Sequence, residues 1–146
     1  MILIDANILI YAVNQDAPLH SAAQRWLERA IGHGEPLGLA WNVILAFLRL
    51  TTRAGLFRNP MPVETAFDLV DAWLSEPSVT IVEPGPQHGR VLRDLLLTAG
   101  TAGNLTSDAH LAALAIEHGA ELCSSDSDFA RFGGLRWRNP LVSSVS

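Results

Sequence analysis

Lysine is absent from the sequence, and cysteine occurs once, at Cys123. A single thiol excludes an internal disulfide and a zinc site built from paired thiolates. Because Cys123 lies in an apolar segment, we expect it in the core and not as a nucleophile. Without lysine, mechanisms that need a catalytic amine are excluded. Arginine, which favours planar bidentate contacts to phosphate, supplies all the permanent positive charge of the side chains.

Long apolar runs are also missing. Stretches such as Val43–Leu48 fall far short of the roughly 20 residues that span a bilayer. No basic residue precedes Asp5, so the start of the chain predicts neither a signal peptide nor a transit peptide. We therefore expect a cytoplasmic protein that does not contact a membrane.

The composition is that of a folded domain, because 49% of the 146 residues are hydrophobic and only 17% are charged. Short apolar strand patterns alternate with helical patterns, and we expect one domain spanning residues 1–146. The expected strands cover residues 1–4, 36–40, 79–82, 121–124 and, at one edge, 135–138. The expected helices cover residues 19–31, 41–53, 62–75, 87–99 and 108–118. This alternation predicts an α/β fold with a mostly parallel sheet of four to five strands and helices on both faces.

Two further expectations concern individual helices. Residues 41–53 are apolar nearly all round until Arg49, so this helix should be largely buried. Ser107 precedes the helix expected from Asp108 and is a suitable N-terminal cap.

Aspartates stand at three distant places that the predicted sheet can bring together. Asp5 follows the first strand, Asp108 lies in the first turn of a helix, and Asp126 and Asp128 follow the fourth strand. Each has an ordinary alternative role, as an Asx turn, a helix cap or a partner of the helix dipole. Ligands of parallel sheets bind beyond the carboxyl ends of the strands, where Asp5 and Asp126 both fall.

A cluster of carboxylates persists near neutral pH only if a cation compensates it. Oxygen-only ligands select a hard ion, Mg²⁺ or Mn²⁺, and the turn after Asp126 lacks the glycine and late glutamate of an EF-hand loop. The net charge of −5 ordinarily disfavours a nucleic-acid partner. If a metal binds four aspartates, however, the remaining net charge is only about −1.

Four segments in this order resemble the PIN-domain ribonucleases of the VapC toxin type. They are Asp5-Ala6-Asn7, residues 41–50 from Trp41 to Leu50, residues 108–115 from Asp108 to Ala115, and residues 125–132 from Ser125 to Phe132. The resemblance covers nearly the whole chain. It implies a three-layer PIN-like fold and a Mg²⁺-dependent endoribonuclease that cuts structured RNA and is silenced by a cognate antitoxin.

The resemblance also implies roles for individual residues. It places the metal ligands at Asp5, Asp108 and Asp126, with Asp128 as a further acid of the catalytic group. Asn7 and Ser125 match positions that support these acids. The chain departs from many PIN domains at Ala46, where an acid is usual, so the number of metal ions stays open. Which of Asp126 and Asp128 reaches the metal directly is also open.

Arg49 and Arg53 share the helix face of Ala46 and are candidates for binding substrate phosphate, or else they are solvated arginines. The five histidines show no metal-ligand spacing, and we expect surface or helix-end positions for them. His110 lies about 200° round the helix from Asp108 and should point away from the metal.

Two other functions remain open at this stage. A phosphatase or phosphoacceptor would use Asp5 as a nucleophile, but Asn7 stands where such phosphatases have a second acid, and the lysine that receiver domains need is missing. With Ala46 in place of an acid, the chain could also be a catalytically impaired PIN-like binding module. The apolar faces of residues 19–31 and 62–75 are the expected surfaces for an antitoxin and for a second copy in a homodimer.

Overall fold

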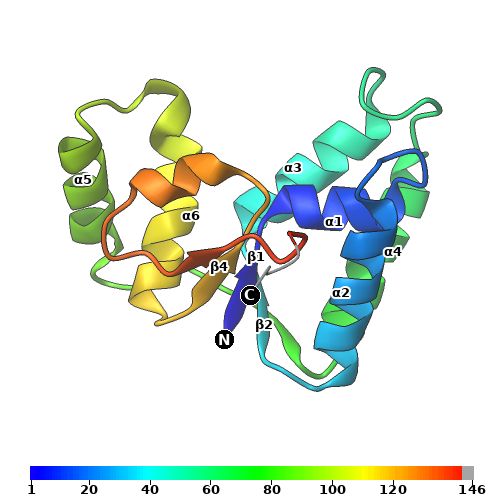
Figure 1. Cartoon of the computed structure of the whole chain (residues 1–146), viewed down its shortest axis with the longest axis horizontal. Helices are drawn as coiled ribbons and strands as arrows, with labels where there is room; N and C mark the ends of the chain where they lie inside the picture. The colour runs from blue at the N-terminus through cyan, green and yellow to red at the C-terminus, as the bar shows by residue number, and fades with distance from the viewer. Residues whose placement is uncertain (143–146) are drawn as a thin grey trace.

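The computed structural model describes residues 1–142 and contains a five-stranded sheet (Figure 1). The strands are β1 (Ile2–Ile4), β2 (Leu37–Leu39), β3 (Val79–Ile81), β4 (Glu121–Cys123) and β5 (Trp137–Arg138). Their order is β3-β2-β1-β4-β5, and every neighbouring pair is parallel. The expected parallel sheet is confirmed. The domain expected over residues 1–146 includes four residues that lie outside the described range.

Helices cover both faces of this sheet. They are α1 (Ala6–Val13), α2 (His20–Gly32), α3 (Trp41–Thr52), α4 (Val63–Ser75), α5 (His88–Ala99) and α6 (Thr106–Glu117), with short 3₁₀ turns η1 (Gly103–Leu105) and η2 (Ser127–Arg131). The helix α1 packs on α2 and α3, α3 packs on α4, and α5 packs on α6. Figure 1 shows α5 and α6 on one side of the sheet and α1, α2 and α4 on the other.

The centre of the sheet is buried on both faces. In β1, Ile2, Leu3 and Ile4 are at most 5% exposed, which explains why this strand reads as an unbroken apolar run and not as an alternating one. In β2, a Cβ atom at Gly38 would lie only 2.5 Å from Cγ2 of Val82. Glycine is therefore required where these two segments approach each other.

Two expectations about the helices are wrong. Trp41 and Leu45 of α3, four residues apart, are 47% and 58% exposed, and Leu45 lines an open cleft and not the core. Ser107 does not cap α6, which begins one residue earlier and has no side-chain cap. The turn η1 leads directly into α6, and the Thr106 hydroxyl donates to the Gly103 carbonyl at 2.8 Å. Within residues 1–142, no helix is both long and apolar enough to cross a bilayer.

Candidate functional site

The strand order reverses between β1 and β4, and the candidate site lies at this point. From β1 the chain moves to β2 and β3 on one side, whereas β4 and β5 lie on the other. Ile4 pairs with Cys123, and the next backbone N–H, that of Asp5, donates to the Cys123 carbonyl at 3.0 Å. The residues that follow the two strands, Asp5 and Ser124, therefore lie side by side. Such a reversal is where open parallel sheets bind ligands.

Asp5 is held in place by three hydrogen bonds. Its Oδ1 accepts from the Ala6 N–H at 2.7 Å, which caps α1. Its Oδ2 accepts from the Ser124 hydroxyl at 2.7 Å and from the Asn7 amide at 3.3 Å. Burial raises the pKa of Asp5, while the hydrogen bonds from Ser124 and Ala6 oppose that rise. A carboxylate has about four acceptor positions, so Asp5 is both a helix cap and a pre-positioned ligand.

Ser124 links the two strand ends and was missed by the sequence analysis, which named its neighbour Ser125. The Ser124 oxygen donates to Asp5 and accepts from the Asn7 amide and the Asp126 N–H, both at 3.1 Å. Its side chain is fully buried, and its hydrogen-bonding capacity is filled. Ser125 supports the site through its backbone, because its N–H donates to Oδ1 of Asn7 at 3.2 Å. Asn7 thus connects Asp5 to the loop after β4.

Asp126 and Asp128 belong to the turn that follows. Oδ1 of Asp126 accepts from the Asp128 N–H at 2.9 Å and caps η2, so the alternative capping role also holds here. Asp128 is exposed and lies 3.9 Å from the Arg131 guanidinium. An exposed pair at this distance contributes little to stability.

Asp108 faces the same region from the first turn of α6. Burial and then the negative charges of Asp5, Asp126 and Asp128 raise its pKa from 3.8 to about 6, and the positive charge of Arg131 opposes this rise. The charges of the other three aspartates named from the sequence therefore all act on Asp108. This crowding of negative charge is what a bound cation relieves.

Asp5 and Asp108 open onto a cleft of about 270 Å³. Its other lining residues come from α1, α3 and the start of α6, and they are Ala6, Asn42, Val43, Leu45, Ala46, Arg49, Ser107 and Leu111. Arg49 therefore lines the same cleft as the two acids. Arg53, one residue past the end of α3, is not among the lining residues. Ala46 lies in the wall of the cleft, so its small side chain leaves this wall without an acid.

The donor set and charge of the cleft fit a hard divalent ion, since its charged ligands are carboxylate oxygens alone. Within residues 1–142, no three acidic, histidine or cysteine side chains are drawn together into a closed ligand set. The side chain of Asn42 is a further feature of the cleft. Oδ1 of Asn42 is buried and, in the described part of the chain, is the one buried side-chain oxygen or nitrogen without a hydrogen-bond partner.

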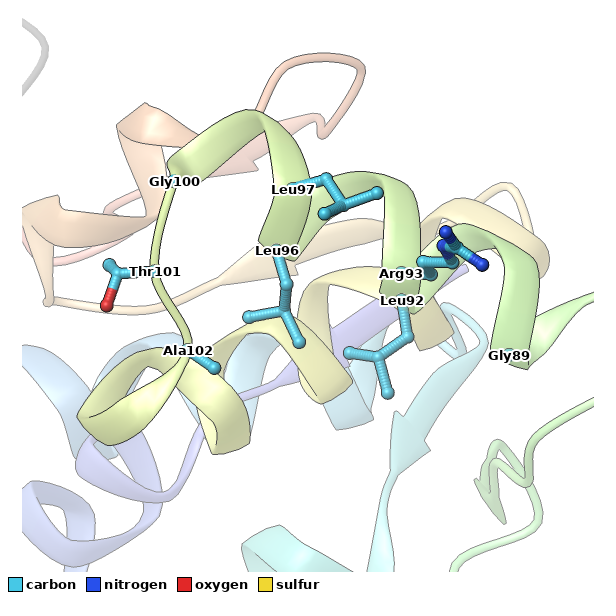
Figure 2. Close-up of a pocket in the computed structure, with 8 residues that line it drawn as sticks. All are labelled: Gly89, Leu92, Arg93, Leu96, Leu97, Gly100, Thr101 and Ala102. Carbon is cyan, nitrogen blue, oxygen red and sulfur yellow. The ribbon is translucent and has the colours of Figure 1, made fainter.

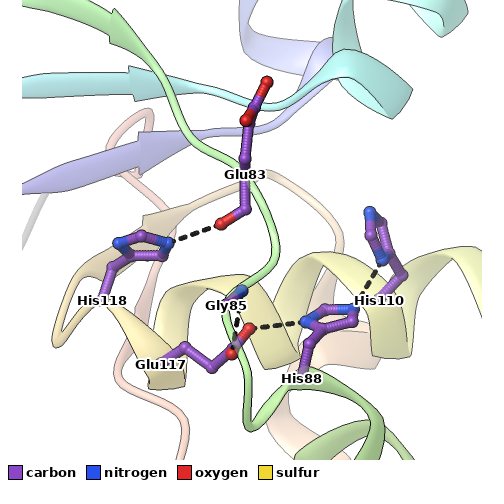
Figure 3. A network of polar contacts seen from close by, with 6 residues as sticks. All are labelled: Glu83, Gly85, His88, His110, Glu117 and His118. Carbon is purple, nitrogen blue, oxygen red and sulfur yellow. Dashed lines mark hydrogen bonds and ion pairs between the residues drawn. The ribbon is translucent and has the colours of Figure 1, made fainter.

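His88 and His110 form a polar network with Glu117 (Figure 3). Nδ1 of His88 lies 2.6 Å from Glu117, and its Nε2 lies 2.9 Å from Nδ1 of His110. Glu117 also accepts from the Gly85 N–H at 3.2 Å. His88 is the first residue of α5, one of the helix-end positions expected for the histidines, and its side chain is only 12% exposed. These bonds fasten α5 to α6, and His110 turns toward α5, with burial and then His88 lowering its pKa.

A second hollow, of about 550 Å³, lies along α5 and the loop that follows it (Figure 2). Its walls are mainly apolar, with Leu92, Leu96 and Leu97 on α5 and Ala102 opposite. Arg93 is its single charged lining residue among those described, and no carboxylate lines it. The hollow therefore lacks the groups that the chemistry of the acidic cleft requires.

Comparisons with known proteins agree with the observed fold. The PIN domain family model matches residues 2–135. The chain is 47% identical over 140 residues to Ribonuclease VapC37 of Mycobacterium tuberculosis, covering 96% of this chain and 97% of that protein. VapBC2 from Rickettsia felis, bound to a promoter DNA fragment, has a TM-score of 0.71 at 20% identity, covering 95% of this chain and 98% of that one. VapC20 of Mycobacterium tuberculosis, described as a sarcin-ricin loop cleaving toxin, has a TM-score of 0.66 at 18% identity, covering 93% and 99%.

Proposed function

This chain belongs to the PIN-domain family and to its VapC ribonuclease branch, and from this premise we propose that it is a toxin that cleaves structured RNA in the cytoplasm with Mg²⁺, which Mn²⁺ can replace. One observation carries the proposal. Burial, and then the negative charges of Asp5, Asp126 and Asp128, raise the pKa of Asp108 to about 6. Four carboxylates that crowd one another at the reversal point of the sheet form a site that is completed by a divalent cation.

We assign Asp5, Asp108 and Asp126 as the metal ligands, with Asp128 adding negative charge. When bound, the divalent ion supplies Lewis acidity toward the phosphoryl oxygens and lowers the pKa of water. The residues of the chain position the reactants. Ser124 and Asn7 fix the Asp5 carboxylate. Since Oδ1 of Asp126 accepts from the Asp128 N–H, we assign its Oδ2 as the acceptor of a proton from the attacking water.

Arg49 is the substrate-binding residue that the geometry supports best. It lines the cleft with Asp5 and Asp108, and its planar guanidinium suits a phosphate group. Arg53 lies just beyond the helix end, and we assign it to a more distant phosphate of the same RNA. Structured RNA is the substrate class that agrees with the description of VapC20 as a toxin that cleaves the sarcin-ricin loop.

An antitoxin and a second copy are the proposed protein partners. A groove of about 360 Å³ lies between α1, α2 and α4, and its apolar wall includes Leu27, Leu69 and Trp73. It is our proposed antitoxin site, and the structural likeness to VapBC2 supports a partner of this kind. Val63 and Phe67 of α4 are 66% and 43% exposed, and we propose this surface for homodimer formation.

The alternative is a catalytically impaired PIN-like binding module, and the observation that favours it is Ala46, which leaves one wall of the cleft without an acid. A cleavage assay separates the two functions. We expect purified protein with Mg²⁺ or Mn²⁺ to cleave bulk bacterial tRNA and ribosomal RNA, and Asp5→Ala and Asp108→Ala to reduce the rate by at least about 100-fold, as expected for the loss of metal-dependent catalysis.

The Asp5→Ala variant must be shown to fold, because Asp5 caps α1 and its removal weakens that helix. Asp5→Asn keeps the cap and the shape while removing the charge, so it should be folded and inactive. Asp94→Ala, at a position of α5 where the side chain is 65% exposed, is the matched control and should cleave at the wild-type rate. Equal cleavage by wild type and Asp5→Asn would contradict the proposal.

A further inference from the structure

Asn42 is a cleft residue whose side chain lacks a partner within the described chain. It is the second residue of α3 and shares the cleft wall with Ala46, one turn later, and Arg49, two turns later. The same cleft contains Asp5 and Asp108. Its Oδ1 is buried and accepts no hydrogen bond from residues 1–142. This oxygen is independent of the aspartates that define the site, because it carries no charge and lies on a different helix.

A buried acceptor without a donor is unusual. More than 90% of buried polar groups in proteins are hydrogen-bonded, and a buried group left unpaired destabilises the folded state. A leucine at position 42 has the same branched skeleton, although a larger volume, and carries no such penalty. The unpaired Oδ1 of Asn42 therefore adds nothing to the stability of the fold, and rotation of the side chain into the cleft would present this acceptor to a donor from outside the chain.

The chemistry of the cleft narrows the identity of that donor. The carboxylates of Asp5 and Asp108 can only accept hydrogen bonds when ionised, and so can the phosphates of RNA. Arg49 is a donor, but it lies seven residues after Asn42, which is about 10 Å along the helix. Its guanidinium is also our proposed phosphate ligand. The donors that remain are the N–H groups of the nucleobases, which RNA shares with DNA, and O–H groups. We favour an O–H group, because the proposed ligands of this cleft are the cation and the RNA backbone. A ribose 2′-hydroxyl is one source of it, and a water that enters with the divalent ion is the other.

We propose that Asn42 is a ligand-binding residue of the acidic cleft, and that its Oδ1 accepts a hydrogen bond from an O–H group of the ribose or of the water that accompanies the cation. This inference rests on the proposed ribonuclease function. It gives α3 a polar contact to the ligand one turn before Ala46, the position at which the usual acid is missing.

Three variants test the proposal. Asn42→Leu removes the acceptor while keeping the branched skeleton, Asn42→Ala removes it by truncation, and Asn42→Asp keeps an acceptor oxygen at the same distance from the backbone. Asn59→Ala changes an exposed asparagine in the loop between α3 and α4 and is the matched control. We expect Asn42→Leu to raise the melting temperature in EDTA by about 2–4 °C, as relief of an unpaired buried group predicts. A merely structural role for Asn42 predicts a lower melting temperature.

Two binding experiments distinguish the sources of the O–H group. In the first, Mn²⁺ is titrated without RNA. In the second, a labelled tRNA transcript and a DNA of the same sequence are titrated in EDTA, where no cleavage occurs. If the donor is a water of the cation, Asn42→Ala and Asn42→Leu weaken Mn²⁺ binding about 3- to 10-fold, the effect of one lost hydrogen bond, while Asn42→Asp retains the affinity. If the donor is the ribose, the same variants weaken tRNA binding by that factor and leave DNA binding unchanged.

Unchanged binding of Mn²⁺ and tRNA by the Asn42 variants would overturn the inference. Wild-type protein that binds Mn²⁺ and cleaves RNA upholds the proposed function on its own. If Asn42→Ala and Asn42→Leu then bind Mn²⁺ and tRNA within twofold of wild type, Asn42 contacts neither ligand. If wild type binds neither Mn²⁺ nor tRNA, the proposed function and this inference both fall.

Discussion

Replacing Asp108 by asparagine tests the crowding of charge in the cleft directly. The pKa of Asp108 is raised from 3.8 to about 6 by burial and by the neighbouring carboxylates. Between these two values the unfolded chain loses the Asp108 proton while the folded protein keeps it. The stability that this group contributes is therefore fully present below about pH 4 and is lost as the pH rises through about 6. Asparagine keeps the shape of the side chain and removes the titration.

The magnitude follows from the size of the shift. A rise of roughly two pKa units corresponds to about 3 kcal/mol, and the partial exposure of Asp108 reduces this to about 1.5 kcal/mol because solvent screens the repulsion. An acid in the first turn of a helix gains about 0.3–1 kcal/mol from the helix dipole, which the substitution forfeits. The net gain for Asp108→Asn above pH 7 is about 1 kcal/mol, or about 3 °C in melting temperature for a domain of this size.

The assay is thermal unfolding of wild type, Asp108→Asn and the control Asp94→Asn, in EDTA at pH 4 and at pH 7.5. We expect the first two to differ at pH 7.5 and to converge at pH 4, and the control to match wild type at both. Added Mn²⁺ should reverse the order at pH 7.5, because only wild type retains the full ligand set. If Asp108→Asn unfolds at or below the wild-type temperature at pH 7.5 in EDTA, the reasoning about charge crowding is refuted.

Two further predictions concern the support of Asp5 and the proposed antitoxin groove. Ser124→Ala removes the hydroxyl that donates to Asp5 and accepts from the Asp126 N–H, so urea unfolding should show a loss of about 1–3 kcal/mol. The acid limb of the pH–rate profile should also move to higher pH, and a variant unchanged in both respects would remove Ser124 from the site. Leu69→Asp places a charge in the groove between α2 and α4, and we expect it to block co-purification with the cognate antitoxin while RNA cleavage persists. Ala72→Asp, on the exposed face of α4, should still co-purify, and retention of the antitoxin by Leu69→Asp would place the contact elsewhere.

The sequence predicted the parallel sheet because buried strands leave an unbroken apolar signature. Asp5 and Asp126 could be placed at its carboxyl edge for the same reason, since each follows such a strand. Ser124 could not be distinguished from Ser125 in this way, because the choice depends on the pairing register of β1 with β4. Once Ile4 is known to pair with Cys123, the next residues along, Asp5 and Ser124, follow by counting.

Other features depend on contacts between helices, which a single sequence does not reveal. His88 and Glu117 are 29 positions apart and meet only because α5 packs on α6. Trp41 and Leu45 are exposed although their apolar character predicted burial, and Leu45 lies in the wall of the cleft that also contains residues of α6. The unpaired oxygen of Asn42 is a property of its surroundings, and no sequence pattern signals it.

The alanine at position 46 has a consequence for the ionisation of Asp108. With a pKa of about 6, Asp108 is roughly nine-tenths ionised at pH 7, so few protons compete with a cation for its oxygens. A further acid, in the wall of the cleft at position 46, would raise this pKa again by like-charge repulsion. A rise of about one unit would leave Asp108 only half ionised at pH 7, and the proton would then compete with the metal. A neutral residue at position 46 therefore keeps Asp108 available as a ligand near neutral pH, and the neutral Asn42 adds polarity to the same wall without adding to the repulsion.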